Sequence, residues 1–267
     1  MKVVRTVAGV RKALEPSRAG RELGLVPTMG AFHGGHLALF RAARAECDTV
    51  VASLFVNPAQ FGDEADLVAY PRDEERDLRV AEEAGVDVVF APAVEEMYPP
   101  GYQTWVDVEE ISRGLEGAAR PGHFRGVATV CLKLFTVVRP QRVYFGQKDA
   151  QQTALIRRLV RDLELELAVR VLPTVRDPDG LALSSRNVRL SAEERERALA
   201  LPRALEAGRE AWSTGSDPVA AARAALNGLE PDYVELLDLG DATVLAAAAR
   251  VGSTRLIDNV LLEGDLE

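Results

Sequence analysis

The stretch Leu25-Val-Pro-Thr-Met-Gly-Ala-Phe-His-Gly-Gly-His-Leu-Ala-Leu-Phe40 decides the fold of the first part of this chain. It begins as a short apolar strand, breaks at Pro27, passes through a glycine-rich turn and continues as a helix. Such a turn places backbone N–H groups and the positive end of a helix dipole at the carboxyl edge of a sheet, where they can hold a phosphate. Two of the three histidines, His33 and His36, lie in this turn, and their i,i+3 spacing allows both rings to face one anion.

The spacing alone leaves two interpretations of this turn open. One is a tight connection between strand and helix that carries two surface histidines. The other is the His-x-x-His signature, usually written HIGH, of a superfamily of adenylyl-transferring enzymes. In that superfamily the imidazoles bind ATP phosphates and stabilise the negative charge that develops at the α-phosphorus. The rest of the chain has to decide between them.

Composition excludes several classes of protein. The 267 residues carry a formal net charge of −9, which argues against nucleic acid or an anionic membrane as the main partner. No apolar run approaches the roughly 18 residues of a membrane span, and residues 1–16 lack the apolar core of a signal peptide. Cys47 and Cys131 have no zinc-binding spacing and are assigned to apolar surroundings, so we expect two reduced core cysteines and a cytoplasmic protein.

The order of apolar runs predicts an α/β fold. Helical patterns alternate with short β-branched runs that fit parallel strands covered on both faces. We therefore expect a doubly wound, Rossmann-like parallel sheet over residues 1–175, with ligands at the carboxyl ends of its strands. The expected strands after the first twenty residues are 24–26, 49–56, 86–90, 142–145 and 166–172, and the expected helices include 76–84, 127–138 and 150–163.

The pattern changes from about residue 176 onward. A loop over residues 177–187 leads into an Ala/Glu/Arg-rich helix that opens with the cap Ser191-x-x-Glu194. More helices follow, and residues 233–237 and 255–259 resemble strands. We interpret residues 176–267 as a smaller α+β domain that is hinged at the Ser-Ser-Arg loop.

Lysine is scarce in this chain, which draws attention to the motif Gly146-Gln-Lys-Asp149. Lys148 closes a predicted strand and opens a helix, where the helix dipole mildly disfavours a cation. A surface lysine is the simpler interpretation. The conflict with the dipole favours a ligand for an anion instead.

The loop Leu183-Ser-Ser-Arg-Asn187 offers two hydroxyls, a guanidinium and backbone N–H groups. By itself it is typical of a helix cap or a hinge. Adenylate-forming enzymes with a HIGH turn also have a mobile KMSKS-like loop, whose hydroxyls and cation hold the phosphates. Two motifs in this order are a much stronger signal than either one alone.

Other polar residues are less specific. Gln60 and Gln152 lie just beyond predicted strand ends, where an amide can hold hydroxyl, carboxylate and amine groups. The segment Arg120-Pro-Gly-His-Phe-Arg-Gly126 contains the third histidine and is either a helix entry or a wall of the anion pocket. No nucleophile triad or metal-binding box is visible, and only Asp77 and Asp149 are candidates for water-mediated contact with magnesium.

Taken together, these segments closely resemble the pantothenate synthetase (pantoate–β-alanine ligase) family over nearly the whole chain. By itself His-x-x-His would leave many adenylyltransferases open, but the combination is highly specific. The matching stretches are Val26–Leu37, Phe55–Phe61, Tyr70–Asp73, Glu96–Pro99, Arg120–Val127, Phe145–Asp149 with Gln151 and Gln152, Pro173–Arg176, Gly180–Asn187 and Arg255–Asn259.

This resemblance implies a two-step ligase that uses ATP and Mg²⁺. Pantoate is first adenylated, and β-alanine then displaces AMP to give pantothenate. Gln60 and Gln152 would bind pantoate, Gln60 also incoming β-alanine, and His36, His33, Lys148 and Arg186 would act in catalysis. The ATP contacts it implies are Met29, Gly30, Ala31, Phe32, His33, Gly34, Gly35, His36, Gly146, Gln147, Lys148, Asp149, Val175, Leu183, Ser184, Ser185 and Arg186.

The family pattern also implies a homodimer, and the chain departs from that pattern at three positions. Leu183 stands where the family often has Met, Gln147 replaces the usual Glu, and Ala150 replaces an aromatic residue. The main alternative is another HIGH-motif nucleotidylyltransferase whose product is the adenylated substrate. A tRNA synthetase fragment and a non-enzymatic ATP-binding protein are the remaining alternatives. The acidic net charge disfavours the tRNA synthetase fragment, and the presence of all four catalytic candidates disfavours the non-enzymatic protein.

Overall fold

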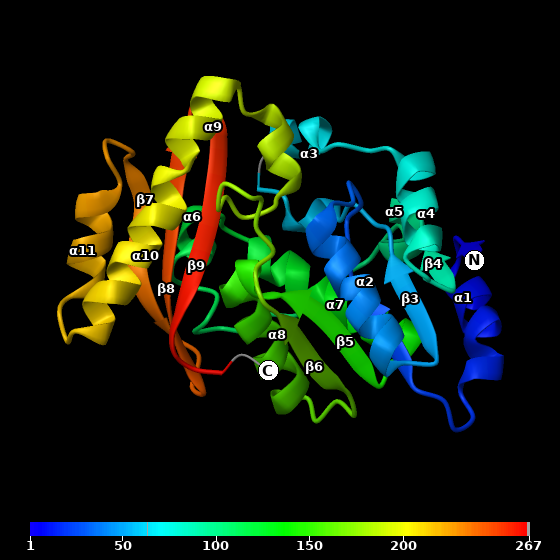
Figure 1. Cartoon of the computed structure of the whole chain (residues 1–267). Coiled ribbons are helices and arrows are strands. Elements are labelled where there is room, and N and C mark those ends of the chain that lie inside the picture. The colour runs from blue at the N-terminus through cyan, green and yellow to red at the C-terminus, as the bar shows by residue number, and fades with distance from the viewer. Residues whose placement is uncertain (63, 266–267) are drawn as a thin grey trace. The chain divides into compact units, whose positions relative to one another are not determined.

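The expected apolar strands form one six-stranded sheet in the computed structural model, which describes residues 1–62 and 64–265 (Figure 1). The spatial order of its strands is β1-β4-β3-β2-β5-β6, and the register pairs β1 with β4, β4 with β3, β3 with β2 and β2 with β5 in parallel. The strands are β1 (Lys2–Val4), β2 (Leu23–Val26), β3 (Thr49–Ser53), β4 (Val88–Phe90), β5 (Arg142–Gly146) and β6 (Ala168–Leu172).

The centre of this sheet is the point where the chain reverses its direction of winding. After β2 the chain adds β3 and β4 on one side, and it later adds β5 and β6 on the other. Ligands in doubly wound sheets bind at the carboxyl ends of the strands beside such a switch point. The turn that follows β2 lies at this place. The predicted doubly wound α/β fold is confirmed.

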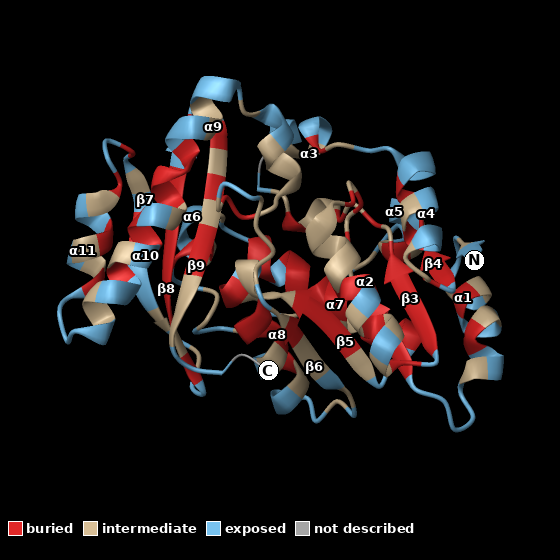
Figure 2. Ribbon diagram, in the orientation of Figure 1, coloured by how far each residue is buried: buried red, intermediate tan, exposed pale blue. Residues whose placement is uncertain are grey.

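Strand residues alternate between two apolar layers, as the period of two requires. Figure 2 shows β3 and most of β5 as buried. Leu25 belongs to the layer that α1 (Val7–Leu14), α7 (His123–Val138) and α8 (Ala150–Asp162) cover. Val26 belongs to the layer that α2 (Gly34–Glu46) and α4 (Glu74–Glu83) cover. The helices and 3₁₀ turns between β1 and β6 are α1 (Val7–Leu14), η1 (Glu15–Ser17), α2 (Gly34–Glu46), η2 (Pro58–Gln60), α3 (Glu64–Ala69), α4 (Glu74–Glu83), α5 (Val94–Met97), α6 (Glu116–Ala119), α7 (His123–Val138), η3 (Gln147–Asp149) and α8 (Ala150–Asp162).

By its internal contacts the chain divides into two units. The first comprises Met1–Phe145 and Gln152–Leu172, and the second comprises Gly146–Gln151 and the chain from Pro173 onward. The short segment that carries Lys148 therefore groups with the C-terminal part of the chain.

The second unit is a three-stranded antiparallel sheet with helices packed on it. Helix α10 (Ala200–Ser213) approaches the central strand β8 (Ala242–Val251) so closely that a Cβ on Gly208 would lie 2.2 Å from Leu245. The elements after Pro173 are η4 (Ser185–Arg189), α9 (Ala192–Ala198), α10 (Ala200–Ser213), α11 (Pro218–Ala225), β7 (Pro231–Asp238), β8 (Ala242–Val251) and β9 (Thr254–Gly264).

Several element boundaries and one whole strand differ from expectation. Strand β3 ends at Ser53 rather than Val56, and α7 begins at His123, four residues earlier than its apolar run. Strand β8 was not expected at all. Its sequence includes Ala246 to Ala249, and alanine has low strand propensity. The run becomes the central strand because β7 and β9 pair with it on both sides.

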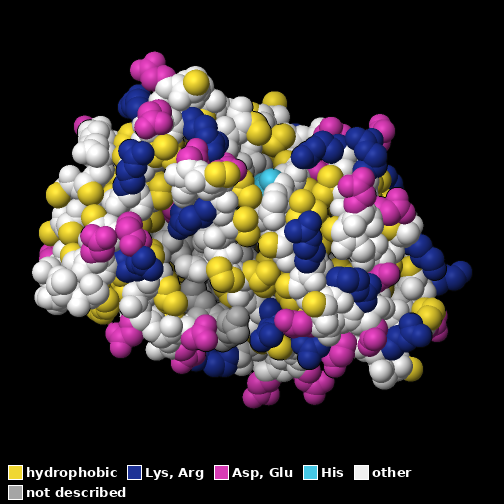
Figure 3. Space-filling view, viewed as in Figure 1, with side chains coloured by type: hydrophobic (Ala, Val, Ile, Leu, Met, Phe, Trp, Pro, Cys, Tyr) yellow, Lys and Arg dark blue, Asp and Glu magenta, His cyan; other side chains and the backbone are white. Residues whose placement is uncertain are grey.

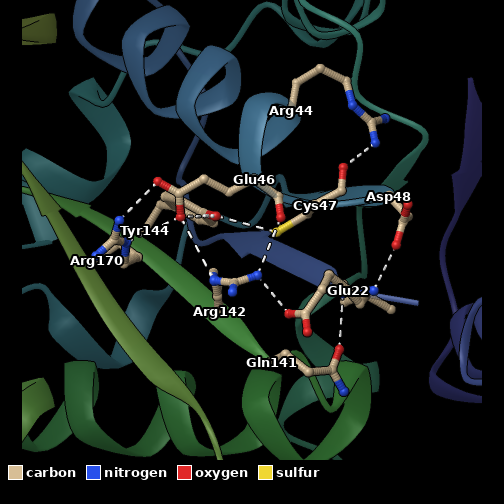
Figure 4. Close-up of polar contacts among 10 residues, drawn as sticks. Glu22, Arg44, Glu46, Cys47, Asp48, Gln141, Arg142, Tyr144 and Arg170 are labelled. Carbon is tan, nitrogen blue, oxygen red and sulfur yellow. Dashed lines mark hydrogen bonds and ion pairs between the residues drawn. The ribbon is translucent and has the colours of Figure 1, made fainter. Parts of the chain in front are cut away.

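A polar cluster ties α2 to the sheet at the edge opposite the β2–α2 turn (Figure 4). Glu46, at the end of α2, accepts two hydrogen bonds of 3.1 Å from the guanidinium of Arg170 on β6. The Tyr144 hydroxyl donates to the same carboxylate at 3.2 Å and lies 3.2 Å from the buried Sγ of Cys47. Arg142 donates to the carbonyl of Glu46 at 3.2 Å. These bonds fix the end of α2 against β5 and β6.

The surface mixes charges of both signs. Lys and Arg side chains are interspersed with Asp and Glu over the face drawn in Figure 3. Among the described residues, no helix combines the length and apolar character that crossing a membrane would require.

Candidate active site

The turn between β2 and α2 is held in a left-handed conformation by a buried carboxylate. Gly30 has a φ of +88°, and a Cβ there would lie 2.7 Å from Leu54 and 2.8 Å from Asp77. Ala31 also has a positive φ of +54°, which costs a residue with a side chain about 1–2 kcal/mol. Asp77 of α4 is 1% exposed and accepts the N–H groups of Ala31 at 2.7 Å and Phe32 at 2.8 Å.

These bonds give Asp77 a role in shaping the turn just before the histidines. Both of its carboxylate oxygens accept backbone N–H groups. The predicted water-mediated contact of Asp77 with magnesium stays a prediction. The sequence offered no sign of the bracing contact, because 46 positions separate Asp77 from Ala31.

His33 and His36 cap the start of α2 with their rings. His33 Nδ1 accepts the N–H of Gly35 at 3.2 Å, and His36 Nδ1 accepts the N–H of His33 at 3.3 Å. The two ring centroids lie 4.3 Å apart, so the predicted juxtaposition of the rings is present. A backbone N–H can only donate, so in the neutral ring Nδ1 accepts and the proton is on Nε2. Each histidine therefore has its ring donor at Nε2.

Gln60 is buried at the carboxyl end of β3, in the 3₁₀ turn η2, and Asn57 fixes its orientation. Asn57 Nδ2 donates to the carbonyl oxygen of Gly126 at 3.1 Å and to Gln60 Oε1 at 3.0 Å. A carbonyl oxygen can only accept, which settles which end of the Asn57 amide is the donor. Gln60 must then present its Nε2 on the other side, where it lies 3.1 Å from Met29 Sδ.

Tyr98 completes this chain of hydrogen bonds. Its hydroxyl donates to Asn57 Oδ1 at 2.9 Å. Burial raises the pKa of the Tyr98 phenol well above its ordinary value, which keeps the hydroxyl protonated as a donor. The hydrogen bonds therefore run in one direction: Tyr98 donates to Asn57, and Asn57 donates to Gln60. Asn57 and Tyr98 were not among the predicted site residues, although both lie within the motifs quoted for the family resemblance.

The third histidine supports the backbone of Gln60. His123, the first residue of α7, is buried and places Nδ1 2.8 Å from the Gln60 carbonyl oxygen. Arg120 donates to the same oxygen at 3.4 Å and lies 3.1 Å from His123 Nε2. The segment forms the entry to α7, as one of its two interpretations predicted, and its role as a wall of the anion pocket stays a prediction.

Gln152 lies in the first turn of α8, which follows β5, and is half-buried. Gln60 follows β3, so both glutamines come after carboxyl ends of strands in the same parallel sheet. In the first unit the structure thus brings together the turn of residues 29–36, Gln60 and their supports.

In the second unit, Lys148 lies in η3 with a side chain that is 18% exposed, and its Nζ is 3.8 Å from Asp149 Oδ1. The side-chain amide of Asn259 on β9 donates to the backbone carbonyls of Gln147 and Lys148, each at 2.9 Å. The position of the lysine segment therefore depends on a residue near the C-terminus.

The other predicted phosphate-binding loop of the second unit is also ordered by local bonds. The N–H of Leu183 donates to the carbonyl of Val175 at 2.9 Å, which brings these two predicted ATP contacts together. Ser184 caps η4, because its Oγ accepts the N–H of Arg186 at 3.2 Å. Ser185 and Arg186 are the first residues of that turn.

Within residues 1–62 and 64–265, no cluster of three or more His, Cys, Asp or Glu side chains has the arrangement of a metal site. The donors described above are instead amides, imidazoles, cations and backbone N–H groups. This chemistry suits a polyanion and a small polar acid.

The chain is similar to proteins of one family along its whole length. The family model described as pantoate-beta-alanine ligase matches residues 2–261. Pantothenate synthetase of Chloroflexus aurantiacus is 52% identical over 99% of each chain, and that of Heliobacterium modesticaldum is 53% identical over 93% of this chain and 94% of its own.

Solved structures give the same result. Pantothenate synthetase from Thermus thermophilus superposes with a TM-score of 0.93 at 48% identity, covering 98% of this chain and 99% of the other. The Francisella tularensis pantoate-beta-alanine ligase, complexed with beta-gamma ATP and beta-alanine, has a TM-score of 0.86 at 34% identity and is covered completely, as is this chain.

Proposed function

The chain belongs to the pantoate–β-alanine ligase family, and we propose that it condenses pantoate with β-alanine through a pantoyl adenylate made from ATP. The observation that carries this proposal is the family match over residues 2–261, which includes every candidate segment of the site. The relative from Francisella was crystallised with beta-gamma ATP and beta-alanine, two of the three substrates that this reaction needs.

The first step forms the adenylate. A carboxylate oxygen of pantoate attacks the α-phosphorus of ATP, the bond from that phosphorus to the bridging oxygen breaks, and pyrophosphate leaves. The Nε2–H groups of His33 and His36 are suited to donate to the phosphate oxygens as their charge rises. Because their Nδ1 atoms are engaged in capping α2, the rings need no reorganisation to do so.

The second step forms the amide. The amine nitrogen of β-alanine attacks the acyl carbon, the bond from that carbon to the AMP oxygen breaks, and the nitrogen loses a proton to water. No covalent enzyme intermediate is needed, which agrees with the lack of a nucleophile triad in the sequence. The acyl adenylate must be kept from water until the amine arrives.

Gln60 is the residue proposed to hold pantoate and then β-alanine. Asn57 donates to the side-chain oxygen Oε1 of Gln60. The Nε2 group is therefore the end of the amide that can donate to a carboxylate or hydroxyl oxygen of the acid. Gln152 is proposed as a second contact with pantoate. A pair of amide donors can bind the acid through hydrogen bonds without adding a charge that would repel the adenylate or bind it too tightly.

The proposed ATP contacts are those that the family resemblance implies. In the first unit they are the turn residues Met29 to His36. In the second they are Gly146 to Asp149, Val175, Leu183 and Ser184 to Arg186. We propose that residues 176–267 act as the lid domain, with 1–175 as the larger domain, and that Lys148 and Arg186 supply the cations for the phosphates.

Magnesium, assembly and location complete the proposal. Mg²⁺ is expected on the ATP phosphates, as this ion usually keeps several waters and few protein ligands, with Asp149 as a water-mediated contact. The family resemblance supports a homodimer, and the two free cysteines support a cytoplasmic location.

The experiment that tests this function is ATP–pyrophosphate exchange in the presence of Mg²⁺ and pantoate, but without β-alanine. We expect exchange that depends on pantoate, and release of AMP together with pantothenate when β-alanine is added. Exchange that another acid supports in place of pantoate would contradict the substrate. Accumulation of a stable adenylated product that β-alanine does not consume would favour a nucleotidylyltransferase.

A further inference from the structure

Two adjacent polar residues of β9, Asp258 and Asn259, are almost completely buried. Their exposed fractions are 3% and 2%, and their register partners on β8 are Ala247 and Ala246. Buried polar groups cost free energy unless they are hydrogen-bonded, so their partners reveal what they do. Both residues lie in the C-terminal run Arg255–Asn259, for which the sequence suggested no role.

Asn259 holds the backbone of the segment that carries Lys148. Its Nδ2 donates to the carbonyl oxygens of Gln147 and Lys148, each at 2.9 Å, and its Oδ1 accepts from Gln147 Nε2 at 3.2 Å. Two carbonyl acceptors settle the orientation of the Asn259 amide without ambiguity. One side chain therefore binds three groups of η3.

Asp258 holds the base of the loop that leads to Ser184. Its carboxylate accepts two hydrogen bonds from the Arg176 guanidinium, at 2.6 Å and 3.0 Å, and a third at 2.8 Å from the N–H of Asn259. Arg176 also donates to the carbonyl of Gly180 at 3.1 Å and pairs with Ala182 in an isolated β-bridge. The bidentate ion pair is the strong form of this interaction.

We propose that Asp258 and Asn259 are positioning residues for ATP, with Asn259 setting the position of Lys148 and Asp258 that of the Ser184–Arg186 loop. This inference rests on the proposed role of Lys148 and that loop in binding the phosphates. Asp258 and Asn259 are neighbours on one strand. Under this proposal they position two segments, at Lys148 and at Ser184–Arg186, that lie more than thirty residues apart in the sequence.

The physical reason is that the Asn259 amide binds the backbone carbonyls on which the position of Lys148 depends. The 3₁₀ turn η3 is three residues long, and short turns of this type have weak internal hydrogen bonds. Without the Asn259 amide, the carbonyls of Gln147 and Lys148 would lose their shared donor. The ammonium group would then sample several positions, and ATP binding would include the cost of ordering it.

The test compares Asn259→Ala, Lys148→Ala and the double variant in steady-state kinetics with ATP varied. We expect Asn259→Ala to raise the KM for ATP on the order of tenfold, while the KM for pantoate changes less than about twofold. If Asn259 acts through Lys148, its replacement in the Lys148→Ala background should add less than about twofold. Asn259→Ser, which keeps one small donor, should give an intermediate KM and replaces the Ala variant if that one does not fold.

Asp232→Asn is the matched control. Asp232 of β7 forms an ion pair of 2.5 Å with Arg255, which lies on β9 like Asn259 but at the other end of the Arg255–Asn259 run. We expect its KM for ATP to equal that of the wild type.

The outcomes separate the two levels of inference. If Lys148→Ala leaves the KM for ATP unchanged, the proposed role of Lys148 is wrong, whatever Asn259 does. If Lys148→Ala raises the KM for ATP, but a folded Asn259→Ala or Asn259→Ser variant does not, the positioning role of Asn259 is overturned. Fully additive effects in the double variant would also overturn it, because they would show that Asn259 acts independently of Lys148.

Discussion

At the scale of single residues, the histidine pair has two separable tasks. Nδ1 of each ring caps α2, whereas Nε2 is the atom that the proposed chemistry requires. An asparagine places an oxygen near the position of Nδ1 and has nothing at Nε2. It is also one of the best residues for capping a helix. Replacement by asparagine should therefore remove one task and keep the other.

His33→Asn is predicted to keep the stability of the wild type within about 0.5 kcal/mol while losing most activity, because the cap survives. His33→Ala should lose activity and also about 1 kcal/mol of stability. His36→Ala should cut turnover on the order of a hundredfold or more. Urea denaturation and steady-state turnover measure the two effects. Full activity in His33→Asn would remove that ring from the chemistry.

Glu46 shows how an ion pair at the far edge of the sheet makes stability depend on pH. The hydrogen bonds from Arg170 lower the pKa of the Glu46 carboxyl below its usual 4.5, against the opposing effect of burial. A carboxyl with a lowered pKa in the folded state contributes stability at pH values above the unfolded pKa. That contribution is lost as the pH falls through the folded pKa.

Glu46→Gln is accordingly predicted to cost about 1 kcal/mol at pH 7, since the pair is bidentate but partly exposed. The difference from wild type should shrink as the pH falls below the usual pKa of about 4.5, because the Glu46 carboxyl then binds a proton more readily in the unfolded chain than in the folded one. Urea titrations over this range measure it. Glu75→Gln, which removes an exposed i,i+4 pair with Arg79, is the control and should cost less than about 0.5 kcal/mol. A cost for Glu46→Gln that stays constant with pH would contradict the assignment.

At the scale of elements, the site depends on how closely α7 approaches the turn that contains Gln60. A Cβ on Gly126 would lie 2.3 Å from the carbonyl oxygen of Ala59 and 2.6 Å from the N of Gln60. Both are backbone atoms that cannot rotate away. The close contact also allows Asn57 to reach the carbonyl of Gly126.

Gly126→Ala is therefore predicted to destabilise the protein by about 1–3 kcal/mol, although alanine favours helix formation. It should also raise the KM for pantoate more than that for ATP, because the displaced residue is Gln60. The comparison is Gly114→Ala, where an added Cβ meets no atom within 4 Å, so stability and both KM values should be unchanged. Equal behaviour of the two variants would mean that α7 can retreat without cost.

Elements also show where local sequence information ends. Residues 24–26 and 86–90 contain β-branched and apolar residues that are typical of strands, and β2 and β4 formed there. Strand β8 has a run of alanines instead, and it became a strand through pairing with β7 and β9 rather than through its own propensity. Helix α7 began four residues before its apolar run, at His123, whose ring is held by Gln60.

At the scale of the whole molecule, both cysteines belong to the first unit. Cys47 and Cys131 are free and buried, and burial raises the pKa of the Cys131 thiol to about 12. A thiol that is buried and protonated reacts slowly with disulfide reagents. The second unit contains no cysteine in this sequence.

Thiol labelling should therefore report on the opening of the first unit alone. In native protein at pH 8 we expect less than about one tenth of the thiols to react in the time that denatured protein reacts completely, and two thiols per chain in denaturant. Rapid reaction of one thiol in the native state would show that the sheet opens locally beside that cysteine. Cys131→Ser and Cys47→Ser variants identify which one reacts.

The sequence by itself determined the parallel sheet, the glycine-rich histidine turn and the candidate residues of the site. These depend on local patterns, because strand periodicity, glycine content and short motifs are readable within about ten residues. Only the tertiary structure decided what holds the candidates in place. Asp77 braces the turn from 46 positions away, and Asn259 holds Lys148 from 111 positions away. Such pairs are fixed by sheet register and by the need to satisfy buried polar groups, which no local pattern contains.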